Sequence, residues 1–380
     1  MRSNYIFTIL LFFILTHYVY SQQYDKDIDY SDSSSFVYEQ NAKKLIGGSF
    51  LYGYMIPHAK EVLPVRGLNP KGYELFFSWH LFNDDVWNDC KCYPRLGVFA
   101  SYYDFDLDVL LGRGYSAGMA FTYFFGLPDD FNFHLKGRGG LSYLTNPYDP
   151  TKEIVNWSYS TNLNFILSAG GGITFRPSGR IEIQLDGSMN HQSNAAYLEP
   201  NGGINYWAIA LSTNYFLDTP DFFPREIYDP YPTLEKKKRW DASFSWGISS
   251  MPFALPGQVP MYNITILRSI QLWRIFAVTF AGEFERNGRA VEMVKRFTPD
   301  KAVSPYRGSL LAGGEFLMGR TLFGIQLGGY VYRPYIEKDD IFQRWYLVYN
   351  LFDDIYTGIT FKSYRNAADH FSFRFTYSFR

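Results

Sequence analysis

Hydrophobic and polar side chains alternate with a period of two residues along most of the chain after Lys44. The last segment, residues 369–380, shows the alternation most clearly. One face carries Phe371, Phe373, Phe375, Tyr377 and Phe379, and the other carries His370, Ser372, Arg374, Thr376 and Ser378. Because successive side chains of a β-strand point to opposite faces, this pattern predicts strands with one apolar and one polar face.

The same alternation recurs in residues 74–81, 133–143 and 344–351, and about sixteen such segments follow Lys44. A soluble β-sandwich rarely sustains strands of about ten residues with aromatic side chains at both ends of the apolar face. The pattern therefore predicts an all-β fold, a transmembrane antiparallel up-and-down β-barrel of about fourteen to sixteen strands. Its apolar face would contact lipid and its polar face would line the interior.

The connections between these segments alternate in length. Short polar turns are expected at residues 127–132, 176–179, 318–320 and 351–354, and longer loops at residues 57–70, 145–158, 190–204 and 286–307. In bacterial barrels the short turns are periplasmic and the long loops are extracellular.

Two connections on the expected periplasmic side, residues 83–94 and 218–238, are too long for this rule. The second could divide the strands into two groups, 44–217 and 239–380, that form two barrels or one wide barrel. Closure of the whole sheet is the simpler expectation, since it leaves no strand edge exposed in lipid.

The N-terminus has the charged start, apolar centre and small-residue end of a secretory signal, predicted over residues 1–21. Its apolar run is shorter than the roughly 20 residues that a spanning helix needs. Residues 22–43 are rich in Asp, Ser and Tyr, which predicts a flexible periplasmic lead-in. Together with the strands, these segments predict a protein of the bacterial outer membrane.

Composition and charge narrow the possible functions. Aromatic residues make up 20% of the chain while the mean hydropathy is −0.19, which suits a wall with only one apolar face. Lys and Arg number 36 against 37 Asp and Glu, so the chain lacks the basic character of a nucleic-acid-binding protein. Cys90 and Cys92 lack the partners of a metal site, and we interpret them as a local structural element, possible as a Cys-x-Cys link in an oxidising compartment.

The candidate chemistry lies in residues 181–205, which are predicted to form a strand, a loop and the start of the next strand. By parity, His191 and Ser193 fall on the apolar face of the first strand, at its outer end. A His and a Ser two residues apart on one face are within reach of each other, so the imidazole could take the hydroxyl proton and activate a nucleophile. The acyl esters of outer-leaflet lipids would lie at this depth.

The sequence His191-Gln-Ser193-Asn194-Ala195, followed by Pro200-Asn201-x-Gly203, resembles the signature of the outer-membrane lipid A 3-O-deacylases, related to acyloxyacyl hydrolases. The resemblance covers roughly residues 44–217. It implies Ser193 as nucleophile, His191 as base and Asn194 or Asn201 as oxyanion donor. It also implies lipid A, or lipopolysaccharide, as the partner, with no metal and no cofactor.

One position departs from the family. The acidic residue expected twelve positions after the Ser is Asn205 here. Parity places Asn205 on the same side as His191, so its amide oxygen could orient the imidazole, although the charge is missing. Glu199, in the intervening loop, is an alternative orienting acid.

Other interpretations stay open at this point. His191 and Ser193 could be ordinary interfacial and loop residues, in which case the chain would be a non-catalytic outer-membrane barrel, either a porin-like channel or a binder of solutes or lipids. The remaining histidines of the mature chain are dispersed without metal-ligand spacing and are expected to be polar residues of loops or of the barrel interior; they are His58, His80, His134 and His370. The pattern does not predict the oligomeric state.

Overall fold

The computed structural model describes residues 42–83, 86–87, 90, 92–125, 130–218, 237–251, 257–297, 304–335, 339–365 and 367–379. The expected signal, most of the lead-in, and residues 219–236 of the long connection lie outside the described residues.

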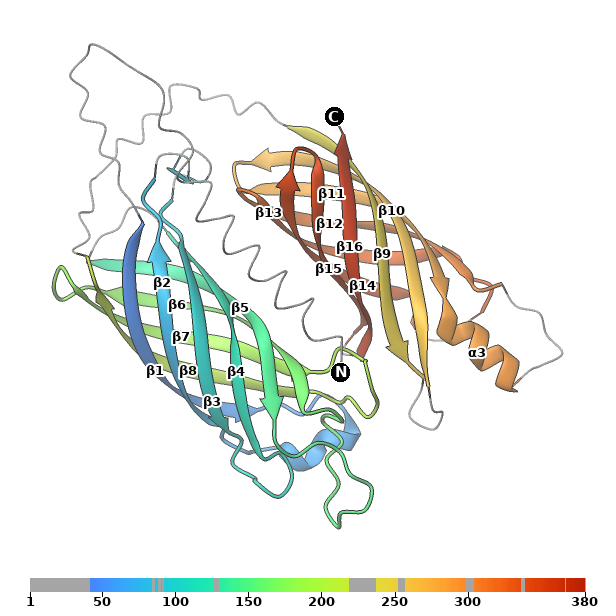
Figure 1. Ribbon diagram of the computed structural model, residues 1–380, viewed down its shortest axis with the longest axis horizontal. Helices are drawn as coiled ribbons and strands as arrows, with labels where there is room; N and C mark the ends of the chain where they lie inside the picture. Colours follow the sequence, from blue (N-terminus) through green and yellow to red (C-terminus); the bar gives the residue numbers. More distant parts are fainter. Residues whose placement is uncertain are drawn as a thin grey trace. The chain divides into compact units, whose positions relative to one another are not determined.

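The described residues form sixteen strands in two sets of eight (Figure 1). The first set is β1 (Lys43–Met55), β2 (Lys71–His80), β3 (Arg95–Asp104), β4 (Arg113–Phe124), β5 (Phe131–Leu144), β6 (Leu163–Phe175), β7 (Ile181–Ser193) and β8 (Ile204–Phe216). The second set is β9 (Lys238–Ser250), β10 (Gln258–Trp273), β11 (Phe276–Asn287), β12 (Tyr306–Met318), β13 (Thr321–Tyr332), β14 (Ile341–Phe352), β15 (Ile355–Tyr364) and β16 (Ala367–Phe379).

Each set of eight strands closes on itself as an antiparallel barrel. In the first barrel β1 pairs with β8, from Leu45 opposite Phe216 to Met55 opposite Tyr206. In the second, β16 pairs with β9, with Phe379 opposite Trp240. The expectation of one wide barrel is therefore wrong. Two closed barrels leave no unpaired strand edge either, so the need to avoid edges exposed to lipid does not distinguish two barrels from one.

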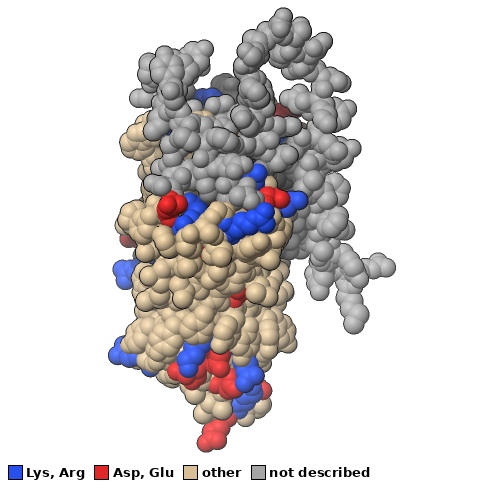
Figure 2. Space-filling view, turned by 90° about the vertical axis from the view of Figure 1, so that its left-hand side faces the viewer, with Lys and Arg blue, Asp and Glu red and all other residues tan. Residues whose placement is uncertain are grey.

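The barrel walls are apolar outside and polar inside. On β7 the outward Leu185 is 46% exposed, whereas the inward Glu182 is fully buried. On β8 the outward Ile209 is 64% exposed. Figure 2 shows one face of the molecule, on which charged residues gather in two bands with a broad, mostly uncharged zone between them. An apolar exterior with charged rims is the surface that a barrel presents to a bilayer.

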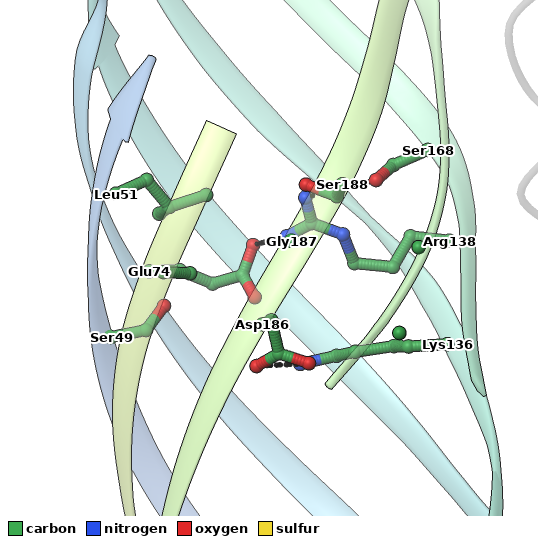
Figure 3. Close-up of a pocket in the computed structure, with 12 residues that line it drawn as sticks. Ser49, Leu51, Glu74, Lys136, Arg138, Ser168, Asp186, Gly187 and Ser188 are labelled. Atoms are coloured by element: carbon green, nitrogen blue, oxygen red, sulfur yellow. Dashed lines mark hydrogen bonds and ion pairs between the residues drawn. The ribbon is translucent and has the colours of Figure 1, made fainter. Parts of the chain in front are cut away.

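Side chains fill the interior of the first barrel with ion pairs. Arg138 pairs with Glu74, and Lys136 lies 4.0 Å from Asp186 (Figure 3). Nearer the short-turn end, Glu182 binds Arg95 at 2.8 Å and Arg176 at 3.1 Å. Charges of opposite sign therefore compensate one another where water is largely excluded.

The second barrel has the same kind of interior. Glu285 pairs with Arg307 and, at 2.6 Å, with Lys362. At the other end, Arg239 binds Glu315 at 2.7 Å. Glu285 and Arg307 face each other on the neighbouring strands β11 and β12, whereas Lys362 and Arg239 reach their partners across the barrel from strands far apart in the sequence.

Short helices follow two of the strands at the ends where long loops were expected. A 3-10 helix, η1 (Lys60–Val65), follows β1, and α3 (Gly288–Phe297) follows β11. Cys90 and Cys92 are joined by a disulfide, with their Cα atoms 5.1 Å apart, in the connection between β2 and β3. Within the described ranges, no helix combines the length and the apolar character needed to cross a membrane.

Breaking a buried ion pair should lower the stability of the first barrel. Replacing Glu74 by Ala leaves the guanidinium of Arg138 in the barrel without its carboxylate, and we expect the free energy of unfolding to fall by about 3 kcal/mol. Urea titration of the protein in detergent measures this free energy. The folded fraction at each urea concentration is read from the different migration of folded and unfolded barrels in gel electrophoresis. Asp108→Ala breaks the exposed pair with Arg113 and is the control, with little change expected. Equal effects of both changes would contradict the prediction.

Candidate active site

The register of β7 with β8 brings the candidate residues together. His191 on β7 lies directly opposite Asn205 on β8. His191 lies on the same outward-facing side of β7 as Ile183 and Leu185, and its partner Asn205 lies on the outer face of β8. Ser193 follows on the same side of β7 two residues after His191. This part of the barrel lies at its loop end, which we define as the end carrying the connections after β1, β3, β5 and β7.

The three side chains form a continuous line of hydrogen bonds. His191 Nε2 lies 2.8 Å from Ser193 Oγ, and His191 Nδ1 lies 2.5 Å from Asn205 Oδ1. The amide oxygen only accepts, so Nδ1 carries the imidazole proton and Nε2 is free of one. In that tautomer the Ser193 hydroxyl donates to Nε2. The arrangement can therefore transfer the hydroxyl proton to the imidazole.

His58 extends this line beyond Asn205. Its Nδ1 lies 2.6 Å from Asn205 Nδ2. His58 follows β1, and the backbone N–H of Ile56 donates to the Asn205 carbonyl at 2.8 Å, which holds the segment against β8. Burial, and then the proximity of His191, lower the pKa of His58 from its ordinary value. The sequence expectation treated His58 as a dispersed polar residue and missed this contact.

The loop after Ser193 has an unusual backbone. Ala195 and Ala196 both adopt positive φ angles, 55° and 62°, which are disfavoured for residues with a Cβ atom. This conformation turns the backbone N–H of Ala195 toward Ser193 Oγ, 3.4 Å away. Strained residues of this kind are often found at functional sites, where the surrounding contacts hold them in place.

The side chains of Asn194 and Glu199 shape the same loop. Asn194 Nδ2 donates to the Leu198 carbonyl at 2.7 Å and to Ser160 Oγ at 3.0 Å. The Glu199 carboxylate accepts from the backbone N–H of Asn201 at 3.0 Å. The partner of the His191 ring at Nδ1 is thus Asn205, and the structure does not bring Glu199 to that position.

Asn201 also holds the loop, because its Oδ1 accepts from the backbone N–H of Asn194 at 3.0 Å. The connection between β5 and β6 supports the other side of the loop. There, the carbonyl of Ser158 accepts from the N–H of Gly203 at 2.6 Å. A Cβ atom at Gly203 would lie 2.9 Å from His191 Cε1, and the residue has a φ of +72°. Gly203 therefore leaves the space that the imidazole occupies.

The other histidines are interior residues. His80 Nε2 lies 2.9 Å from the Tyr93 carbonyl, and His134 Nε2 lies 2.6 Å from an Asp186 oxygen. His370, in the second barrel, lies 3.0 Å from the carboxylate of Asp369. They are polar residues of the two barrel interiors.

Two family models match the chain. The model "Lipid A 3-O-deacylase (PagL)" matches residues 71–214, in the first barrel, and "Acyloxyacyl hydrolase, C-terminal domain" matches residues 238–380, the second barrel. The lipid A 3-O-deacylase model thus covers most of the first barrel, and the acyloxyacyl hydrolase model covers the second. Both matches indicate a hydrolase of the bacterial outer membrane, and lipid A is the substrate that the lipid A 3-O-deacylase family implies.

The chain is also similar to several solved structures. The outer membrane enzyme PagL is 16% identical over 44% of this chain and 97% of that chain, with a TM-score of 0.29. Neisserial surface protein A is 11% identical over 45% and 96%, with a TM-score of 0.30. The N-terminal barrel domain of Pseudomonas aeruginosa OprF is 12% identical over 46% and 99%, with a TM-score of 0.28. No curated protein sequence matches the chain significantly.

The tight contact at Gly203 makes a prediction. Gly203→Ala should push the His191 ring from its place beside Ser193, and we expect the rate of ester hydrolysis to fall by about a hundredfold, as for an error of about 1 Å in the position of a catalytic group. Gly187→Ala, on the same strand as His191, is the control, since its Cβ would meet no heavy atom within 4 Å. Hydrolysis of a long-chain ester by the two purified variants measures the effect. Equal rates would contradict the assigned position of the ring.

Proposed function

We propose that the first barrel hydrolyses the ester-linked acyl chain at position 3 of lipid A, with Ser193 as nucleophile and His191 as general base. One observation carries the proposal: within the barrel that the lipid A 3-O-deacylase model matches, the Ser193 hydroxyl, the His191 ring and the Asn205 amide form an unbroken line of hydrogen bonds. A serine hydroxyl is a weak nucleophile unless an adjacent base takes its proton, and the His191 ring is suitably placed to do so.

The reaction would proceed in two halves. His191 Nε2 accepts the Ser193 proton as Oγ attacks the carbonyl carbon of the ester. The resulting tetrahedral intermediate collapses as the protonated His191 gives its proton to the departing sugar oxygen, leaving the acyl group on Ser193. Water then attacks the acyl group, with His191 again as base, and the products are a free fatty acid and lipid A with a hydroxyl group at position 3.

The oxyanion of the intermediate needs hydrogen-bond donors. The contacts of the loop favour the backbone N–H of Ala195, which points toward Ser193 Oγ. The side chain of Asn194 is bonded within the loop, so we assign it the role of shaping this turn. Asn201 is a second candidate donor, because its Oδ1 binds the Asn194 backbone and its NH2 group can donate elsewhere.

We place the reaction at the lipid-facing wall, at the level of the outer leaflet. Parity supports this position, since Ser193 and His191 lie on the side of β7 that carries exposed apolar residues. The neighbouring strand β6 places Phe165 opposite Ser193 and Leu167 opposite His191. Ser193 itself is buried, so a fatty acyl chain would first contact these apolar side chains of the wall and approach Ser193 from beside them.

The alternative function, conduction of solutes, gains no support from the first barrel. Two cavities in its interior each hold about 20 Å³, and the charged side chains of Glu74 and Lys136 line both of them. Each has room for about one water molecule. The carboxylates and cations of the interior are paired across the lumen, so they act mainly in holding the wall.

Mass spectrometry of lipid A from cells that express the protein tests the proposal. We expect the wild type to remove one 3-linked acyl chain, whereas Ser193→Ala and His191→Ala should lower the rate by about 10⁴-fold or more and leave lipid A intact. Ser188→Ala is the matched control, because Ser188 lies on the same strand but inside the barrel. If Ser193→Ala removed the chain as fast as the wild type, the proposed mechanism would be wrong.

A further inference from the structure

Asn205 stands in the place of a carboxylate, and its amide can accept a hydrogen bond from His191 in only one of its two orientations. A carboxylate offers two equivalent oxygens to the His191 Nδ1–H group, so either one can accept. An amide has one oxygen and one NH2 group, and only the oxygen can accept. If the Asn205 amide turned by half a rotation, its NH2 group would face the Nδ1–H of His191, and two donors would meet.

The reversed amide would disturb the Ser193 site directly. To avoid the clash, the His191 ring would move its proton to Nε2, where it would face the Ser193 hydroxyl. In that tautomer Nε2 could no longer accept the serine proton, and the base would be lost. A histidine held in the wrong tautomer loses most of its catalytic effect. The activity of an Asn-containing site therefore depends on the direction in which the amide points.

His58 lies at the place where this direction can be set. Its Nδ1 is 2.6 Å from Asn205 Nδ2, while Asn205 Oδ1 is 2.5 Å from His191 Nδ1. A neutral imidazole with its proton on Nε2 has an acceptor at Nδ1. Burial and the nearby His191 ring lower the pKa of His58, which favours the neutral form at neutral pH. With an acceptor at this position, the NH2 group of Asn205 has a partner in only one orientation.

The fold holds His58 against Asn205 through the closure of the barrel. Met55, the last residue of β1, lies opposite Tyr206 on β8. Ile56 directly follows β1, and Asn205 directly precedes Tyr206 on β8. The N–H of Ile56 donates to the carbonyl of Asn205. The N–H of Met55 also donates to the Leu68 carbonyl at 3.0 Å, which ties the returning end of the same loop to β1. Both hydrogen bonds use backbone groups, and they hold the backbone that leads to His58 against β8 and the returning loop.

We propose that His58 is a positioning residue of this site, which accepts a hydrogen bond from Asn205 and thereby keeps the amide oxygen turned toward His191. The inference rests on the proposed function of Ser193 and His191. In this role His58 acts on the Ser193 site through Asn205. The line of hydrogen bonds thus runs from Ser193 through His191 and Asn205 to His58. His58 and the Asn205 amide together take the place of one carboxylate. Because linked hydrogen bonds polarise one another, the bond to His58 also strengthens the acceptor at Asn205 Oδ1.

Four variants of the full-length protein in detergent test this role: His58→Leu, His58→Asn, Asn205→Asp and the double variant His58→Leu/Asn205→Asp. His58→Leu removes the acceptor, and we expect kcat to fall by about thirtyfold with KM nearly unchanged, because tautomers of the base are mixed. His58→Asn keeps an acceptor near the Nδ1 position and should restore kcat to within about threefold of the wild type. Asn205→Asp should raise kcat by at least about tenfold, because it supplies the missing charge.

The double variant separates positioning from general structural support. With Asp at position 205 either oxygen can accept from His191, so His58→Leu should change kcat by less than about threefold in that background. An equal loss in both backgrounds would overturn the proposal, as would wild-type activity of His58→Leu. Heat-modifiable migration of all four variants in gel electrophoresis shows whether each barrel is folded.

A second readout does not depend on turnover. The ¹⁵N chemical shifts of labelled histidine distinguish the Nδ1–H from the Nε2–H tautomer of His191. We expect the Nδ1–H form in the wild type and a mixture of tautomers in His58→Leu, and an unchanged shift would overturn the proposal. If Ser193→Ala kept its activity while the tautomer responded to His58→Leu, the proposed function would fail and the positioning role of His58 would stand.

Discussion

The site depends on the antiparallel register of β7 with its two neighbours. Side chains of a strand alternate between faces, so a slip of one residue between β7 and β8 would send either His191 or Asn205 to the opposite side of the wall. In the observed register these two residues are directly opposite each other and share the outer face. The closure of β1 onto β8 then adds His58, from the other end of the first barrel in sequence. The hydrogen-bonded line is therefore a product of a closed barrel.

The polar interior keeps that register rigid. Arg138 reaches Glu74 across the interior. Glu182 on β7 binds Arg95 on β3 and Arg176, which directly follows β6. These pairs are costly to break, since one buried charge would be left without a partner. With charges inside and apolar side chains outside, the wall can face lipid while its loop end carries the proposed nucleophile, Ser193. The strained turn at Ala195 and Ala196 is held there by hydrogen bonds within the loops.

Much of the geometry of the candidate site could be predicted from the two-residue alternation together with the family resemblance, which singled out Asn205. Parity placed His191, Ser193 and Asn205 on one face, and the structure has all three in one line. The division into two barrels was not predictable in this way, because two closed sheets and one closed sheet both leave no free edge. His58 was missed because 147 residues separate it from Asn205 and no periodicity links them. The role of Asn194 depended on hydrogen bonds inside an irregular loop, which no strand pattern reports.

In the proposed mechanism, the hydrogen bonds from Asn205 through His191 activate the Ser193 hydroxyl. Labelling with an alkyl fluorophosphonate, which bonds covalently to activated serines, measures this activation, because peptide mass spectrometry identifies the modified residue. We expect an adduct on Ser193 in the wild type and none on Ser193 when His191 is replaced by Ala. An unlabelled Ser193 in the folded protein, or labelling that persists without His191, would contradict it.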